Sequence, residues 1–279
     1  MSIRRVLHQF LRSVGFEVVK VETLEQLEAL RIFPDAISRW SSLEELSGLF
    51  QFVMSRLDYS KGQLQQDLVA EYIYLRTPEV FNPTKTFLEF GAASGVALSN
   101  TYYLEKNLGW SGLLCEPSPN FHKSIIDNRS ADLDKRCVSS FSNLTLNFRM
   151  TDNPELATLE EYVNSDSHAD YRRNGRTISV NTVSLDDLLQ DWNISERLFY
   201  LSVDTEGSEY EILREYSFKI KPIFLSIEHN FTANETQLDS LLERNGYIRI
   251  LRSVSLFDGW YLQRELIQLV PELRLMARH

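Results

Sequence analysis

The spacing of apolar residues along the chain changes near residue 80. Before that point, apolar residues recur at intervals of three and four, which is the period of a helix that buries one face. No series of strand-like segments accompanies them. We therefore expect residues 1–80 to form a helical extension and residues 81–279 to form the main domain. The clearest helical stretches are residues 21–31, 41–57 and 61–76.

From Thr86 onward, short apolar runs alternate with amphipathic stretches of roughly ten to fifteen residues. This alternation predicts βαβ units, in which helices connect the strands of a parallel sheet. Two apolar runs near the end, residues 247–255 and 259–263, are close enough to pair as an antiparallel hairpin. The other strands are expected at residues 86–92, 112–117, 136–141, 198–207 and 222–230.

Residues 142–182 do not follow this rhythm. Residues 143–150 alternate between polar and apolar side chains, and a second strand-like run ends near Val183. We interpret the segment as an insertion beside the carboxyl edge of the sheet, where loops commonly carry function. The fold class is therefore α/β, with a mostly parallel sheet and a closing antiparallel hairpin.

The composition excludes several classes of protein. With 43% hydrophobic and 24% charged residues, the sequence is that of an ordinary globular protein. The net charge of -10, without a long basic run, argues against nucleic-acid binding. No apolar run reaches the roughly 18 residues of a transmembrane segment, and the start lacks the apolar core of a signal peptide. We expect a cytoplasmic protein in which Cys115 and Cys137 are buried thiols.

The end of the first predicted strand combines an acid with two glycines. Glu89 is followed by the turn Gly91-Ala92-Ala-Ser-Gly95. Glycines let a ligand approach the backbone closely, and the helix that follows offers free N–H groups. The spacing differs from the G-x-G-x-x-G of a dinucleotide site, and the Lys-Ser/Thr pair of a phosphate loop is missing. Glu89, Gly91, Ala92 and Gly95 are candidate cofactor-binding residues.

The second predicted strand ends in Glu116, which lies 21 residues after Gly95. An acid at this point can accept hydrogen bonds from both hydroxyls of a bound ribose. The glycine turn and this acid together favour a cofactor that contains a nucleoside. Taken alone, they do not distinguish a dinucleotide from S-adenosylmethionine.

Two later strands end in ionisable side chains. Asp204 ends one of them, and Glu228 and His229 end the next. The carboxyl ends of parallel strands meet at one edge of the sheet, so these side chains are expected to converge. Together they could remove a proton from a substrate, and Asp204 and Glu228 could hold a divalent cation such as Mg. All three are candidate catalytic residues, and the two carboxylates are candidate metal ligands.

The insertion adds a polar segment with a separate candidate role. It contains His168, Tyr171, Arg172 and Arg173, which are suited to binding a polar or anionic acceptor. The same composition is equally typical of an exposed loop.

Several separated motifs resemble those of one known family. In their order along the chain they resemble the FkbM family of S-adenosylmethionine-dependent methyltransferases. The resemblance covers roughly residues 84–263 and leaves the first 80 residues outside it. The motifs are FLEFGAASGVALSNTYYLEKNLGWSGLLCEPSP, VNTVSLDDLL, YLSVDTEGSEYEIL and IEHNF, with RCVSS and FDGWYL as looser matches.

The resemblance implies a class I methyltransferase (Rossmann-like) fold, with a seven-stranded sheet of six parallel strands and one antiparallel strand. In that superfamily the third strand often supplies an acid near the adenine. The corresponding stretch here contains no acid, and Ser140 is the candidate residue at this place. By position, the resemblance assigns Glu89, Gly91 and Gly95 to the methionine end of the cofactor, Glu116 to the ribose, and Asp204 to the transferred methyl group.

The resemblance also implies O-methylation, often of sugar or polyketide-derived hydroxyls. We therefore expect an O-methyltransferase that uses S-adenosylmethionine, with Mg as a second cofactor in one hypothesis. The acceptor would be a glycan or a similar polyhydroxylated small molecule. Two alternatives are a methyltransferase fold that only binds a partner and a nicotinamide-dependent oxidoreductase. The oligomeric state does not follow from the sequence.

Overall fold

The computed structural model describes residue 40 and residues 46–166, 168–194 and 198–279. All of them lie in one compact unit, Arg39–His279. Among the described residues, no helix is both long enough and apolar enough to cross a membrane.

Two of the expected N-terminal helices are present in this unit, as α3 (Ser47–Met54) and α4 (Gln66–Tyr74). The helix expected at residues 21–31 lies outside the described residues. Trp40 is fully buried and stacks on Trp260, with ring centroids 6.2 Å apart. Part of the predicted extension therefore packs directly against the sheet, while the division near residue 80 remains a prediction.

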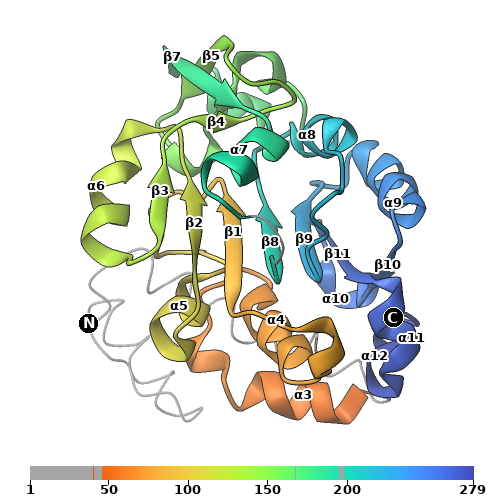
Figure 1. Ribbon diagram of the computed structural model, residues 1–279. Coiled ribbons are helices and arrows are strands. Elements are labelled where there is room, and N and C mark those ends of the chain that lie inside the picture. Colours follow the sequence, from red (N-terminus) through yellow and green to blue (C-terminus); the bar gives the residue numbers. More distant parts are fainter. Residues whose placement is uncertain (1–39, 41–45, 167, 195–197) are drawn as a thin grey trace, which may run out of the picture. The chain divides into compact units, whose positions relative to one another are not determined.

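A seven-stranded sheet forms the centre of the unit, in the order β10-β11-β9-β8-β1-β2-β3 (Figure 1). β1 pairs in parallel with β2 and β8, and parallel pairing continues to β3 on one side and β9 on the other. β11 runs antiparallel to both of its neighbours. The mixed α/β fold predicted from the alternation is confirmed. The strands are β1 (Thr86–Phe90), β2 (Ser111–Cys115), β3 (Asp132–Asp134), β8 (Tyr200–Val203), β9 (Phe224–Glu228), β10 (Tyr247–Ile250) and β11 (Asp258–Gln263).

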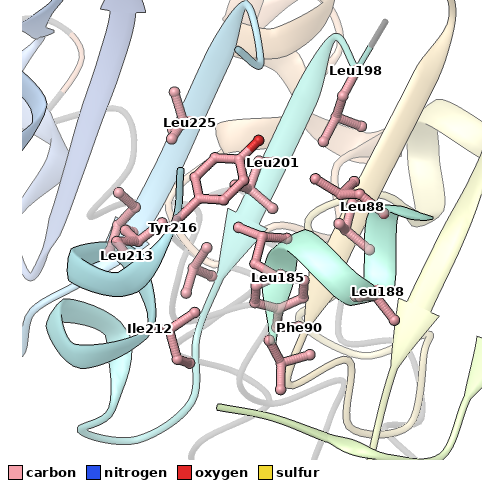
Figure 2. Close-up of a cluster of buried hydrophobic side chains, with 14 of the residues drawn as sticks. Leu88, Phe90, Leu185, Leu188, Leu198, Leu201, Ile212, Leu213, Tyr216 and Leu225 are labelled. Atoms are coloured by element: carbon pink, nitrogen blue, oxygen red, sulfur yellow. The ribbon is translucent and has the colours of Figure 1, made fainter. Parts of the chain in front are cut away.

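One face of the sheet packs against helices through an apolar core (Figure 2). Leu88 and Phe90 of β1 and Leu201 of β8 meet side chains of α7 and α8 there, such as Leu188 and Leu213. Burying each of these side chains contributes about 1.5–3 kcal/mol. Because successive side chains of a strand point to opposite faces, Glu89 faces away from this core. The helices after α4 are α5 (Tyr102–Leu108), α6 (Pro119–Asn128), α7 (Leu185–Asp191), α8 (Glu209–Glu215), α9 (Asn234–Arg244), α10 (Arg252–Ser255), α11 (Arg264–Leu269) and α12 (Pro271–Met276).

The third strand of the main sheet differs from the prediction. The apolar run at 136–141 was expected there, but β3 is the short polar segment Asp132–Asp134. Cys137–Val138 instead forms β4 and pairs with β7 (Arg176–Val183) in a second sheet. An apolar run indicates a buried strand without indicating which sheet it joins, which explains the error. Both cysteines are buried, as predicted.

The first strand of the expected hairpin is shorter than residues 247–255. β10 ends at Ile250, Leu251 adopts a left-handed φ of 52°, and helix α10 follows at once. The left-handed residue reverses the chain and ends the strand.

Together with β4, which precedes it, the insertion forms a second sheet of four strands, in the order β4-β7-β5-β6. This second sheet lies beyond the carboxyl ends of β1 and β2, at the top of Figure 1. Its own apolar cluster includes Phe148, Leu159 and Val180. The two strands not yet described are β5 (Thr145–Met150) and β6 (Thr158–Leu159).

A buried arginine ties the glycine turn to the helices around it. Arg129 follows α6 and its side chain is fully buried. Its Nε donates to Glu105 of α5 at 2.8 Å, and its Nη1 donates to the carbonyl oxygen of Gly95 at 2.8 Å. Its Nη2 donates to Thr101 at 2.9 Å, and the nearest Glu89 oxygen is 3.9 Å away. The guanidinium therefore joins β1, the turn, α5 and α6.

We expect Arg129→Met to lower the free energy of unfolding by about 3–5 kcal/mol, because the buried Glu105 would lose its buried cation and keep only the partly exposed Lys106 at 3.3 Å. Urea denaturation followed by circular dichroism measures the change. Lys123→Met on α6 is the control, since Lys123 is highly exposed and pairs with the exposed Asp127. It should change stability by less than about 0.5 kcal/mol. Equal stability of the two variants would contradict this account of the network.

Candidate active site

A cavity opens at the carboxyl ends of the parallel strands, and the second sheet forms one of its walls. This is the place where ligands bind in open α/β sheets. Residues from β1, β2, β8 and β9 reach it together, as the sequence predicted. The predicted site residues that line it are Glu89, Gly91, Ala92, Glu116, Asp204 and Glu228, together with His168 of the insertion.

The two glycines have steric roles in the fold. A Cβ on Gly91 would lie 1.7 Å from the carbonyl oxygen of Asp204, so only glycine lets these two strand ends approach so closely. Its φ of 65° also favours glycine. Gly95 does not line the cavity, and a Cβ there would lie 2.9 Å from the Ile125 side chain of α6. Gly91 therefore shapes the cavity, whereas Gly95 allows the helix to pack.

Glu89 lines the cavity, but its carboxylate also holds the segment before α5. One oxygen accepts the backbone N–H of Asn100 at 2.8 Å. The other accepts the hydroxyls of Ser99, at 3.0 Å, and Thr101. Burial raises the pKa of Glu89, and Arg129 opposes that shift. The acid that interrupts this apolar strand thus positions the loop around Asn100.

Glu116 joins the glycine turn to the end of β2. Its two oxygens accept the backbone N–H groups of Ala93, at 2.9 Å, and Ser118, at 2.7 Å. Burial raises the pKa of Glu116 to about 7. A carboxylate oxygen has two lone pairs, so each of these oxygens can accept one further hydrogen bond. Apolar side chains line the cavity on this side, namely Pro117, Phe121, Val138 and Phe148.

Asp204 and Glu228 come together as predicted, and Glu206 joins them. Oxygens of the three carboxylates lie within 4.8 Å of one another. Burial, followed by repulsion from neighbouring acids, raises the pKa of Asp204 and of Glu228 well above the ordinary values. Such a cluster favours a proton or a cation. The predicted Mg site stays a hypothesis.

His229 lies outside the cavity lining, although Glu228 next to it is inside. Its Nδ1 accepts the backbone N–H of Phe231 at 3.1 Å, and its Nε2 lies 3.1 Å from Arg249. Burial lowers the pKa of His229. The ring therefore braces the loop after β9. Ser140 also lies outside the lining, because its segment follows β4 of the second sheet.

The arginines of the insertion are already paired. Arg172 is fully buried and binds both oxygens of Asp166, at 2.8 and 3.0 Å, and Glu206 at 2.6 Å. Arg173 pairs with the exposed Asp170 on the surface. Neither guanidinium faces the cavity, so they offer no site for an anionic acceptor there. Arg172 instead fixes the insertion to the loop after β8.

Among the lining residues that the sequence did not indicate are Gln66 and Asp258. Gln66 Nε2 donates to Asp258 at 2.8 Å, so α4 contacts the start of β11. Asp258 lies opposite Glu228 in the antiparallel register. An antiparallel strand enters the sheet at the edge where parallel strands leave it, and this geometry could have indicated Asp258. No local pattern marks Gln66.

These features define an α/β domain whose acid-rich cavity lies at the carboxyl edge of its sheet. The chain matches the sequence model of the methyltransferase FkbM domain over residues 89–249. The match spans more than half of the chain, which therefore belongs to this family, and the predicted resemblance is confirmed. Membership supports a methyltransferase and counts against a nicotinamide-dependent oxidoreductase. A comparison with curated proteins found no match.

The raised pKa of Glu116 predicts a pH-dependent stability. The folded state holds this proton up to about pH 7, whereas an ordinary glutamate releases it near 4.5. The stabilisation that comes from the tighter proton binding of Glu116 in the folded state is complete below about pH 4.5 and is lost as the pH rises through about 7. It amounts to about 3 kcal/mol. In denaturant unfolding, the free energy of unfolding should decline as the pH rises between these values. The decline should be smaller in Glu116→Gln. The exposed Glu243→Gln should keep the wild-type decline. An unchanged decline in Glu116→Gln would refute the assignment.

Proposed function

We propose that this chain is an S-adenosylmethionine-dependent O-methyltransferase that acts on a hydroxyl of a sugar or a similar polyhydroxylated acceptor. The observation that carries the proposal is the cavity itself. At one end it has Glu116 beside the glycine turn, and at the other it has Asp204 and Glu228. The alternative of a purely binding subunit is less well supported, because both carboxylates face the cavity.

The residues at the first end fit the cofactor. Each Glu116 oxygen keeps a lone pair for one ribose hydroxyl, since the backbone N–H groups use only one. The apolar side chains of Pro117, Phe121 and Phe148 offer flat contacts for an adenine ring. No acid would be needed for this contact. The acid that ends β3, Asp134, is bonded to Arg136 and Trp192.

The residues at the other end fit proton removal. When bound, S-adenosylmethionine supplies a methyl group on a positively charged sulfur. The chain must then align the acceptor hydroxyl and take its proton as the new O–C bond forms. Asp204 or Glu228 would receive this proton. Their raised pKa values make them stronger bases than an ordinary carboxylate, once ionised.

Calorimetry with S-adenosylhomocysteine tests the cofactor half of the proposal. We expect the wild-type chain to bind, and Glu116→Ala to bind at least about tenfold more weakly, because two charge-assisted hydrogen bonds are lost. Glu215→Ala, on the exposed end of α8, should bind like the wild type. No binding of either cofactor form by the wild type, or a preference for NAD, would sink the proposal.

Labelled-methyl transfer to a panel of glycans and simple glycosides tests the reaction. At saturating S-adenosylmethionine, Asp204→Asn should lower kcat by roughly 10²–10⁴-fold, because the amide cannot take a proton. Assays with Mg and with a chelator show whether a metal takes part. An Asp204→Asn variant that works at the wild-type rate would remove Asp204 from the mechanism.

A further inference from the structure

We propose that His168 is an acceptor-binding residue of the cavity, and that its Nε2 holds a second hydroxyl on the sugar ring that is methylated. The inference rests on the proposed function and deepens it. It requires an acceptor with at least two hydroxyls on one ring. One of them lies at the carboxylates of Asp204 and Glu228, and the other lies at the imidazole.

His168 reaches the cavity from the insertion, at the start of the short helix η6 (Ala169–Arg172). Glu206 links this histidine to the other acids. An oxygen of Glu206 lies 3.8 Å from His168 Nδ1. The same side chain belongs to the cluster with Asp204 and Glu228, whose oxygens lie within 4.8 Å of one another. The imidazole is therefore within the span of one sugar ring from the two carboxylates.

The ring of His168 turns one nitrogen towards the protein and leaves the other free. Nδ1 is buried, and carboxylate oxygens of Glu206 and Asp166 lie 3.8 and 3.9 Å from it. The side chain is nonetheless 34% exposed, so its exposed edge is the one that carries Nε2. No described residue is hydrogen-bonded to Nε2. This nitrogen is therefore available to a ligand in the cavity.

His229, at the end of β9, shows the opposite arrangement. Its Nδ1 accepts the backbone N–H of Phe231, its Nε2 lies 3.1 Å from Arg249, and its side chain is fully buried. A histidine that serves the fold alone uses its nitrogens within the protein in this way. The free Nε2 of His168 is what distinguishes it from such a residue, and it points to contact with a ligand.

The surroundings of Nδ1 decide what Nε2 can bind. The Glu206 carboxylate raises the pKa of His168, burial opposes this shift, Asp166 adds to it and Arg172 counteracts it. Both carboxylates are bonded to Arg172 and act as acceptors. The neutral ring therefore carries its proton on Nδ1 and leaves the lone pair of Nε2 to the ligand. The protonated ring offers an N–H there instead. A hydroxyl both donates and accepts, so it matches Nε2 in either state.

Nuclear magnetic resonance of the isotope-labelled full chain tests the site directly. The chain has five histidines, and the ring signals of His168 are those that disappear in His168→Asn. Methyl glucoside, methyl galactoside and methyl mannoside are each titrated in, with and without S-adenosylhomocysteine. We expect at least one of them to shift the His168 signals saturably. Its deoxy derivative without the bound hydroxyl should bind at least about fivefold more weakly, because one hydrogen bond is lost.

Two substitutions separate contact with the ligand from a role in the fold. His168→Asn places its amide near the position of Nδ1 and leaves the place of Nε2 empty. His168→Gln carries its amide to the place of Nε2. We therefore expect His168→Asn to bind the glycoside at least about fivefold more weakly than the wild type, and His168→Gln to keep most of the affinity. Both variants should bind S-adenosylhomocysteine like the wild type. Arg173→Gln, an exposed position of the same insertion, is the control and should bind both ligands normally.

Three results would overturn the site. The first is that none of the three glycosides shifts the His168 signals. The second is an affinity of His168→Asn for the glycoside that equals the wild-type affinity. The third is an equal loss of affinity in both variants together with lower melting temperatures, which would make His168 a residue of the fold. A failure of the proposed function looks different, because the wild type would then not bind S-adenosylhomocysteine. The titrations of the free chain would still decide the role of His168.

Discussion

The ion pair between Arg129 and Glu105 holds together the end of the cavity that surrounds Glu116. Burying a guanidinium and a carboxylate is costly unless both are fully hydrogen-bonded, and here the guanidinium also bonds to Gly95 and Thr101. These bonds hold the turn after β1 in its observed conformation. That conformation presents the backbone N–H of Ala93 to Glu116. The position of Glu116, which lines the cavity, thus depends on a cation that does not line it.

The opposite end of the cavity is built on a different principle. Arg172 neutralises Glu206 and Asp166 and so fixes the insertion, whereas no lysine or arginine among the described residues pairs with the neighbouring Asp204 and Glu228. Close acids of this kind destabilise a folded chain, and such groups cluster at functional sites. One pair of acids, Asp166 and Glu206, thus holds the insertion in place, whereas the neighbouring pair, Asp204 and Glu228, lines the cavity.

Much of the site followed from one rule, that parallel strands end at the same edge. It placed Glu89, Glu116, Asp204 and Glu228 correctly around the cavity. The rule did not place His229. Successive side chains at the end of a strand point to opposite faces, so the side chain after Glu228 points away from the cavity. It also misplaced Ser140, since the short polar strand β3 has no apolar run by which to recognise it.

Other parts of the site depend on contacts between distant segments. Gln66 and Asp258 are separated by 192 positions, and only the packing of α4 against the start of β11 brings them together. The spacing of apolar residues around Gln66 correctly predicted a helix, and the spacing around Asp258 correctly predicted a strand. Periodicity describes which face of an element is buried, without naming the element that covers it.

The bond between Gln66 and Asp258 has a consequence for how far the functional unit extends. Both residues fall outside the span 89–249 that carries the family likeness. The part of this chain that matches the family model is therefore smaller than the part that encloses the cavity. An excised segment limited to that span would lack one wall of the cavity on each flank. Two relatives could share the central span and still differ in the flanks that complete the pocket.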